Sequence, residues 1–189
     1  MVTEAGRFVT AAVKRRREVA PIVACFYAVR ALPYALDGAH DGAGLLLQGR
    51  GDCLAKSELM RLAARVLQIP GRYACWLYLL PDVVPEVAEL PSRLDVHRAV
   101  QLRVGGSWVL ADATHHPGLR GTGLRVCEWD GRHDTQPAYP PAGPVLVEDV
   151  AEDAVGQARE QVRLWTASCP GDVLARWRSA YVAWLRQHE

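Results

Sequence analysis

The chain has 189 residues, a length typical of one domain. Half of the residues are hydrophobic and 23% are charged, which allows a packed core and excludes a chain that is disordered throughout. The net charge of +1 disfavours a general nucleic-acid binder, which usually presents a strongly basic face. The 22 basic residues include only two lysines, Lys14 and Lys56, and this bias toward arginine is typical of a GC-rich bacterial genome.

The apolar segments do not predict membrane insertion or secretion. A spanning helix needs ~20 mostly apolar residues, and the best candidate, residues 20–36, is interrupted by Pro21, Arg30 and Pro33. The arginines at positions 15–17 are followed by no uninterrupted apolar stretch and no small-residue cleavage site. We therefore expect a cytoplasmic protein with no membrane partner.

Helices are predicted in the first third of the chain. Residues 3–30 are rich in Ala, Val and Arg and predict helix, with Pro21 starting a second, more apolar helix. Residues 37–44 are dense in Asp and Gly and predict a loop. The clearest helix is predicted over 52–68, with Asp52 as its N-cap. Apolar residues recur there at helical spacing and predict one buried stripe of Ala55, Leu59, Leu62, Ala63 and Val66.

Strands follow these helices, so the sequence predicts an α+β fold. Residues 72–80 are short, aromatic and apolar, and 96–104 and 107–112 alternate around a Gly-Gly pair that indicates a hairpin. Residues 117–146 are rich in Pro and Gly and predict irregular structure, with one short strand at 124–129. Helices are predicted over 147–188, divided at 169–171. The aromatic residues Trp177, Tyr181 and Trp184 have the spacing of a buried helical stripe.

The five cysteines form no disulfide or zinc pattern. Their number is odd and none lies in a C-x-x-C pair. A metal site would have to gather His115, His116, Cys127 and His133, whose spacing matches no known zinc motif, so we expect none. Most of these thiols are expected to be small buried side chains, which leaves one free to act as a nucleophile.

Cys53 is the candidate nucleophile because it directly follows Asp52 at the predicted start of a helix. A cysteine at that place lies at the positive end of the helix dipole, beside backbone N–H groups that have no helical partner. Both features favour the thiolate over the thiol. The same N–H groups can stabilise an oxyanion that forms beside the sulfur. The alternative is an inert cysteine buried at a helix start.

The predicted hairpin brings His97 and Asp112 together. With a two-residue loop at 105–106, Asp112 lies opposite Ala99, and His97 points to the same face as Ala99. Diagonal neighbours of this kind are ~7–8 Å apart between backbones, so an imidazole can reach a carboxylate. Trp108 shares that face and could shield the pair from water. A register shift of one residue would place the two side chains on opposite faces.

These three residues fit one chemical purpose. A thiol nucleophile needs a base that takes its proton and later returns one to the leaving group, and histidine has a suitable pKa. An aspartate can fix the orientation of the imidazole and stabilise its protonated form. Cys53, His97 and Asp112 therefore predict a site for thiol-dependent acyl transfer, which needs no cofactor.

The sequence resembles the transglutaminase-like family, a branch of the papain-like fold, over about residues 30–115. The matching segments are Gly-Asp-Cys at 51–53, the Leu-rich helix after it, Ile-Pro-Gly-Arg at 69–72, His97, and Gly-Ser-Trp-Val-Leu-Ala-Asp-Ala-Thr at 106–114. They are similar to the family's Gly-x-Cys, Gly-Ile-Pro-x-Arg and Gly-x-Trp-hydrophobic-x-x-Asp-x-Thr patterns. The sequence departs from the family after the histidine. The family often has an aromatic residue two positions after it, in a His-Ala-Trp run, whereas His97 is followed by Arg98, Ala99 and Val100.

The resemblance implies a single domain over 1–189, with a catalytic helix packed on a small antiparallel sheet and extra helices at both termini. It implies Cys53 as nucleophile, His97 as general base and acid, and Asp112 as the residue that orients His97. The backbone N–H of Cys53 is the natural first oxyanion donor. Further candidates for the oxyanion or substrate are Gln48, which resembles a papain-type oxyanion glutamine in position, Tyr34, Asp52 and Trp108. Asp95, His115 and His116 could also lie at the edge of the site.

The expected acyl donor is a peptide, another amide, an ester or a thioester, which a carrier protein could hold, and the acceptor is water or an amine. No nucleic acid is expected to bind. Two other interpretations compete with this one. The chain could be a catalytically inactive domain that kept the fold for binding or scaffolding, or it could be a metal-binding protein.

Overall fold

Helices come first along the chain and an antiparallel sheet follows, so the fold is α+β as predicted. The structure is a computed structural model that describes residues 2–147, 156, 160 and 162–189. The helices are α1 (Val2–Arg15), α2 (Pro21–Ala31), α3 (Gly42–Gln48), α4 (Cys53–Val66) and α6 (Gly171–Arg186), with short 3-10 helices η1 (Pro85–Glu89) and η2 (Pro117–Leu119). The strands are β1 (Tyr34–Ala39), β2 (Gly71–Leu79), β3 (Leu94–Val104), β4 (Ser107–Ala111) and β5 (Leu146–Val147).

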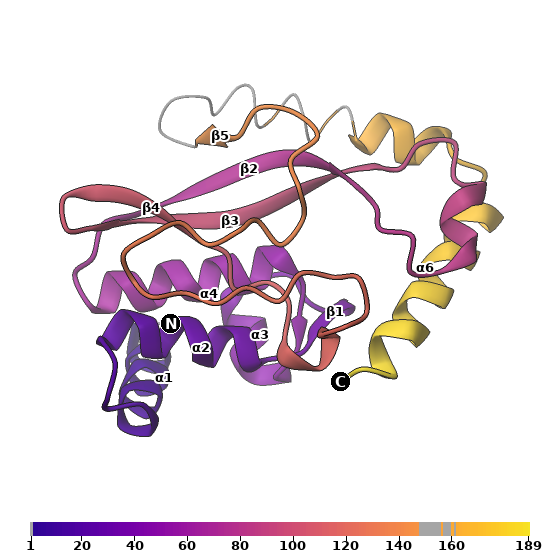
Figure 1. Cartoon of the computed structure of the whole chain (residues 1–189). Coiled ribbons are helices and arrows are strands. Elements are labelled where there is room, and N and C mark those ends of the chain that lie inside the picture. The colour runs from indigo at the N-terminus through magenta and orange to yellow at the C-terminus, as the bar shows by residue number, and fades with distance from the viewer. Residues whose placement is uncertain (1, 148–155, 157–159, 161) are drawn as a thin grey trace.

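Helix α4 is the centre of the helical layer, since α1, α2 and α3 all pack against it and its other side contacts β3. In Figure 1 the sheet lies on one side of α4, and α6 stands at the end of the sheet opposite the β3–β4 turn. Asp52 caps α4 as predicted, because its carboxylate accepts a hydrogen bond from the N–H of Ala55. Within the predicted stripe Ala55, Leu59 and Ala63 are buried.

The sheet has the strand order β4-β3-β2-β5, and every pair in it is antiparallel. The turn between β3 and β4 has the predicted two residues, Gly105 and Gly106, with φ of 60° and 88°. Both angles are in the left-handed region that glycine tolerates best. Val104 therefore pairs with Ser107, and the register predicted for the hairpin is confirmed.

The prediction of a loop at 37–44 is wrong. Strand β1 extends to Ala39, and α3 begins at Gly42 with Asp41 as its N-cap. The Asp41 carboxylate accepts a hydrogen bond from the N–H of Gly44 at 2.7 Å. The Asp and Gly residues that indicated a loop therefore serve as a cap and as sites of close packing.

The strand expected at 124–129 is also absent, since that described segment has no regular structure. Its backbone is held by side chains of α2 instead of a neighbouring strand. Arg30 donates to the carbonyl of Cys127 at 2.7 Å, and the Tyr27 hydroxyl donates to the carbonyl of Trp129 at 3.1 Å. Satisfying the carbonyls in this way removes the need for a sheet partner.

The helices predicted for 147–188 are found in the described residues from 156 onward. Leu146 and Val147 instead form β5, which pairs with β2, where the sequence predicted irregular structure up to 146 and a helix from 147. Residues 162–168 are helical and α6 follows the predicted break, whereas residues 148–155, 157–159 and 161 lie outside the described chain. Trp177 and Tyr181 are buried in the core, as the aromatic spacing predicted. No helix in the described residues combines the length and apolar character that crossing a membrane requires.

Candidate active site

Cys53 is the first residue of α4, and its exposed fraction is 9%. The chain before it is fixed to β1 and to the residue preceding β1 by three backbone hydrogen bonds, from Ala39 to Arg50, from Asp52 to Ala39 and from Gly51 to Pro33. Gly51 is required for this close approach, because a Cβ atom there would be 2.7 Å from the carbonyl oxygen of Ala39. The glycine before the cysteine thus lets β1 hold the helix start in place.

His97 and Asp112 form a buried pair. The hairpin places His97 in β3 and Asp112 directly after β4, and the His97 Nε2 atom is 2.9 Å from the Asp112 Oδ2 atom. Both side chains are 0% exposed. Cys53 lies close enough to the same imidazole to raise its pKa, although the effect of Asp112 is larger. The structure therefore brings together the three residues that the sequence predicted as a catalytic set.

The two ring nitrogens of His97 have different surroundings. Nε2 is bound to Asp112, whereas Nδ1 is buried and has no partner with good hydrogen-bond geometry among the described residues. With the Nε2 hydrogen directed at the carboxylate, Nδ1 of a neutral imidazole carries the free lone pair. That atom is the one available to take a proton from the Cys53 thiol.

The charges of the pair stabilise each other. Burial favours the neutral imidazole, but the charge and hydrogen bond of Asp112, with a smaller effect of Cys53, raise the pKa of His97 above its ordinary value. Burial also favours the neutral carboxyl, but His97 and hydrogen bonds from neighbouring groups lower the pKa of Asp112. The site therefore favours the imidazolium that forms when Nδ1 takes the proton of Cys53, with the Asp112 carboxylate as its partner.

Aromatic rings enclose His97. Trp76 lies directly opposite it in β2, with ring centroids 4.7 Å apart, and the rings of Tyr78 and Tyr139 are 6.1 and 5.1 Å away. Tyr139 stacks on Tyr78 at 4.1 Å, and its carbonyl accepts a hydrogen bond from the Trp76 indole. Tyr139 comes from the irregular Pro- and Gly-rich segment, which gave no sign of this role.

The same segment supports Asp112. The N–H of Ala138 donates to Oδ2 at 2.8 Å, the N–H of Thr114 donates to Oδ1 at 3.3 Å, and the N–H of Asp112 donates to the Thr135 hydroxyl at 3.1 Å. These bonds fix the carboxylate in the orientation that His97 needs. Residues 135–139 thus complete the site from outside the hairpin and α4.

Lys56 is a further buried group that sequence reasoning did not single out. It lies one turn after Cys53, is 1% exposed, and donates to the carbonyls of Arg30, Leu32 and Thr114 at 3.3, 2.6 and 2.6 Å. Burial lowers the pKa of its ammonium well below the ordinary value, although the nearby Asp112 opposes that shift. Lys56 joins α4 to the end of α2 and to the chain that follows Asp112.

The four additional candidates differ in their placement. Tyr34 and Asp52 both line the cavity beside Cys53. The Asp52 carboxylate is already bound to the N–H of Ala55 and to His40. Gln48 is exposed at the end of α3 and is not brought to Cys53, because Gly49 turns the chain there with a φ of 73°.

Trp108 does not shield the histidine pair. It shares the face of Asp112, but it lies near the hairpin turn, where the Arg72 guanidinium stacks on its ring at 4.1 Å. The shielding expected from Trp108 comes instead from Trp76, Tyr78 and Tyr139.

The histidines and cysteine considered for zinc have separate partners. His115 and Cys127 interact with the carbonyls of Arg125 and Gln136, and His133 pairs with Asp130. His116 accepts from the N–H of Tyr34 through Nδ1 and faces the His188 carbonyl through Nε2. Within the described part of the chain no three His, Cys, Asp or Glu residues gather in a metal-binding arrangement.

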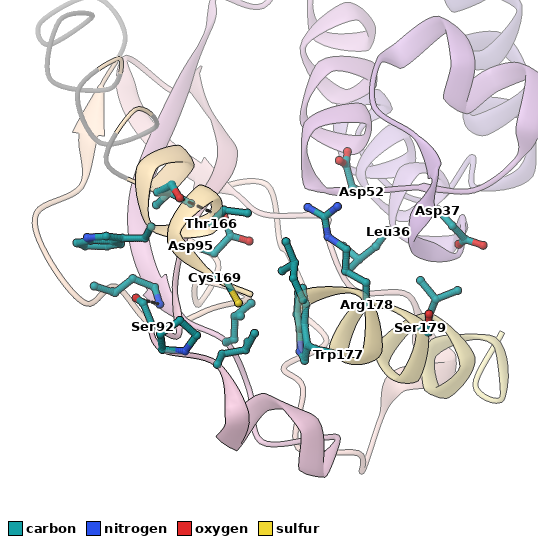
Figure 2. A pocket seen from close by; sticks show the side chains of 18 of the residues that line it. Leu36, Asp37, Asp52, Ser92, Asp95, Thr166, Cys169, Trp177, Arg178 and Ser179 are labelled. Atoms are coloured by element: carbon teal, nitrogen blue, oxygen red, sulfur yellow. Dashed lines mark hydrogen bonds between the residues drawn. The ribbon is translucent and has the colours of Figure 1, made fainter. Parts of the chain in front are cut away.

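A cavity of about 650 Å³ opens beside Cys53. A neighbouring cavity of about 520 Å³ shares seven lining residues with it, and we call the two together the cleft. Asp95, which the sequence placed at the edge of the site, lines both cavities (Figure 2). The Tyr78 hydroxyl donates to its carboxyl at 3.3 Å.

The sequence profile of the transglutaminase-like superfamily matches residues 9–113. The match covers more than half of the chain, and it includes Cys53, His97 and Asp112. It begins within α1, earlier than the core expected from residue 30. The chain belongs to the transglutaminase-like superfamily.

A crystal structure from Cytophaga hutchinsonii, described as a candidate cysteine protease, has a similar fold, with a TM-score of 0.44 and 17% sequence identity. The aligned region covers 76% of this chain and 48% of that one, so this chain spans about half of that protein's length. No curated protein sequence matches this chain significantly.

Proposed function

We propose that this protein is a thiol-dependent acyl-transfer enzyme. Cys53 is the nucleophile, His97 the general base and acid, and Asp112 the residue that orients His97. The observation that carries the proposal is the buried pair of His97 and Asp112, 2.9 Å apart, whose imidazole keeps Nδ1 unoccupied and lies close enough to Cys53 for the cysteine to raise its pKa. Family membership supports the same chemistry.

In the first half-reaction the Cys53 thiol gives its proton to Nδ1 of His97, and the sulfur attacks the carbonyl carbon of the acyl donor. The carbonyl electron pair moves onto oxygen and forms an oxyanion. When the oxyanion collapses, the bond to the leaving group breaks and the imidazolium supplies the proton that the leaving group needs. The product is a thioester on Cys53, with His97 neutral again.

In the second half-reaction water or an amine attacks the thioester while His97 takes its proton. The carbon–sulfur bond then breaks and the proton returns to the sulfur, which restores the enzyme and releases an acid or a new amide. Peptides, other amides, esters and thioesters are all suitable donors, and a carrier protein can present the acyl group. No step needs a metal or an organic cofactor.

The oxyanion is assigned to the first turn of α4. The backbone N–H groups there have no partner within the helix, and the Cys53 N–H is the closest to the sulfur. Tyr34 is the candidate for a second donor, because its buried side chain lines the cavity beside Cys53. Gln48 is not proposed for this role, since its side chain is exposed at the end of α3.

The test is the rate at which iodoacetamide alkylates each cysteine near neutral pH, measured by peptide mass spectrometry. Cys53 should react faster than Cys169, although Cys169 is the more exposed of the two. His97→Ala should slow the alkylation of Cys53 at least about tenfold. The matched control is His133→Ala, which removes a histidine with an 83% exposed side chain and should have no effect.

An inactive binding domain is the alternative function. It predicts that Cys53 in the folded protein reacts no faster than a cysteine in the unfolded chain, and that His97→Ala changes nothing. That result would contradict the enzymatic proposal.

A further inference from the structure

The cleft beside Cys53 has two walls from distant parts of the chain. One wall is formed around the start of α4, by Cys53, Leu54 and the neighbouring Tyr34 and Leu36. The other comes from residues 162–182, which we call the C-terminal wall. Its members at the cysteine cavity are Val162, Arg163, Thr166, Ala167, Leu174 and Arg178. Figure 2 shows Thr166 and Arg178 on this wall, across the cleft from Asp52.

The part of the cleft next to Cys53 is mainly apolar. Its lining includes Leu36, Leu54, Val96, Val162 and Leu174, together with the rings of Tyr34 and Tyr78. Across the cleft, the neighbouring cavity adds the indole rings of Trp165 and Trp177. Such surfaces bind apolar groups, because contact removes water from both partners.

Charged groups at the cleft are exposed or already engaged. Arg163 and Arg178 are exposed, and Arg163 is paired with Glu160. Asp52 is bound to the helix start and His40, and Asp95 is bound to the Tyr78 hydroxyl and the N–H of Val96. An apolar centre surrounded by a polar rim is the arrangement expected of a site that selects an apolar group.

We propose that the substrate carries a bulky apolar group next to its reacting carbonyl, and that this group binds between Leu54 and Leu174. This inference rests on the proposed function, because it places the carbonyl at Cys53. The C-terminal wall lies beyond residues 9–113, the part of the chain that matches the superfamily. Selectivity for the substrate therefore comes from a segment outside the catalytic core.

The test measures binding without chemistry. Cys53→Ala protein is titrated with acetyl-, butyryl- and hexanoyl-glycinamide, which are neutral amides that differ only in the length of the acyl chain. Isothermal titration calorimetry should give a Kd for the hexanoyl amide at least about tenfold lower than for the acetyl amide, since each fully buried methylene contributes up to about fourfold. Equal Kd values, or no binding of the hexanoyl amide, would overturn the inference.

Two matched variants locate the binding surface. Leu174→Gln places an amide in the cleft and should remove most of the preference for the longer chain. Leu164→Gln changes a leucine of the same C-terminal wall that is 49% exposed and lines neither cavity, so the preference should remain. Equal effects of the two variants, with folding checked by circular dichroism, would contradict the role of the C-terminal wall.

The outcomes separate this inference from the proposed function. Rapid alkylation of Cys53 with no preference among the three amides would retain the enzyme and reject the apolar substrate. Tighter binding of the hexanoyl amide with an unreactive Cys53 would retain the apolar site and reject the acyl-transfer chemistry.

Discussion

His97 has a different task at each of its ring nitrogens. Asp112 binds Nε2, and this contact leaves Nδ1 available for the proton exchange with Cys53 that we propose. The hydrogen bonds from Ala138 and Thr114 fix the carboxylate in turn. The orientation of the base therefore depends on groups that reach His97 only through Asp112.

Asp112→Asn should leave the fold intact but lower turnover of an activated ester about 100-fold or more. An amide in that position provides no negative charge for the imidazolium and can present its NH₂ group to Nε2, which favours the wrong tautomer. Steady-state kinetics measure the loss, and Asp134→Asn, at an exposed position, is the control. Full activity of Asp112→Asn would contradict the assigned role.

Stability should depend on pH through the same pair. Folding raises the pKa of His97 from 6.5. The contribution of His97 to the free energy of unfolding is therefore complete below about pH 6.5, and it is lost as the pH rises through the raised pKa. Folding lowers the pKa of Asp112 from 3.8. The contribution of Asp112 to the free energy of unfolding is therefore complete above about pH 4, and it is lost as the pH falls through the lowered pKa.

Urea unfolding of the wild type and His97→Gln at several pH values measures this effect. The difference between their free energies of unfolding should be largest at about pH 5–6 and should shrink toward pH 9. A difference that grows with rising pH would show that His97 is held neutral in the folded protein.

At the residue scale the sequence predicted the groups that local geometry controls. Asp52 indicated a helix start at Cys53, and a two-glycine turn set the register that joins His97 to Asp112. Tyr139 and Lys56 could not be found in this way, since one lies in an irregular segment and the other is a single polar residue on an apolar stripe. Their roles depend on contacts across 42 and 58 residues of sequence.

Helix α4 is connected to its neighbours through one buried lysine. The three N–H groups of Lys56 are bound to carbonyls from two other segments, and two of these carbonyls lie at the C-terminal end of α2. A cation is favoured there by the helix dipole. The connection keeps the helix of Cys53 at a fixed distance from the chain of Asp112.

Lys56→Ala should lower the free energy of unfolding by about 2–4 kcal/mol, because it leaves a cavity and buried carbonyls without a donor. The matched control is Lys14→Ala, at an exposed position of α1, which should change stability by no more than about 0.5 kcal/mol. Urea unfolding at pH 7 measures both values. Equal stability of the two variants would contradict the structural role of Lys56.

Gly106→Ala should lower the free energy of unfolding by about 1 kcal/mol, because the φ of 88° is unfavourable for a residue with a Cβ atom. Open space surrounds this glycine, so the loss comes from the backbone alone. Gly143→Ala is the control, since it also meets no neighbouring atom and has no positive φ. The two free energies of unfolding should differ by about the stated amount, and equal values would contradict the explanation.

At the element scale periodicity and caps predicted α4, the hairpin and α6. The segment at 37–44 was misinterpreted because Asp and Gly have two uses. Asp41 caps α3, and Gly38 allows the backbone of Arg50 to approach within 2.7 Å of where a Cβ atom would lie. Such uses depend on neighbours that a local pattern does not contain.

The whole molecule builds the candidate site from the span that matches the superfamily and from segments outside that span. The core provides Cys53, His97 and Asp112 within the span that matches the superfamily. The outside segments are residues 135–139, which cover His97 and hold Asp112, and the C-terminal wall, which closes the cleft. The family resemblance could predict the core, whereas the covering segments lie outside the region that carries it.

The most direct test of the account is the intact mass of the protein after brief mixing with p-nitrophenyl hexanoate. The account predicts one added hexanoyl group, located on Cys53 by peptide mapping, removed by hydroxylamine, and absent from Cys53→Ala. In His97→Ala the adduct should form far more slowly. Acylation spread over several residues, or equally fast in the absence of His97, would contradict the assignment of Cys53 as an activated nucleophile.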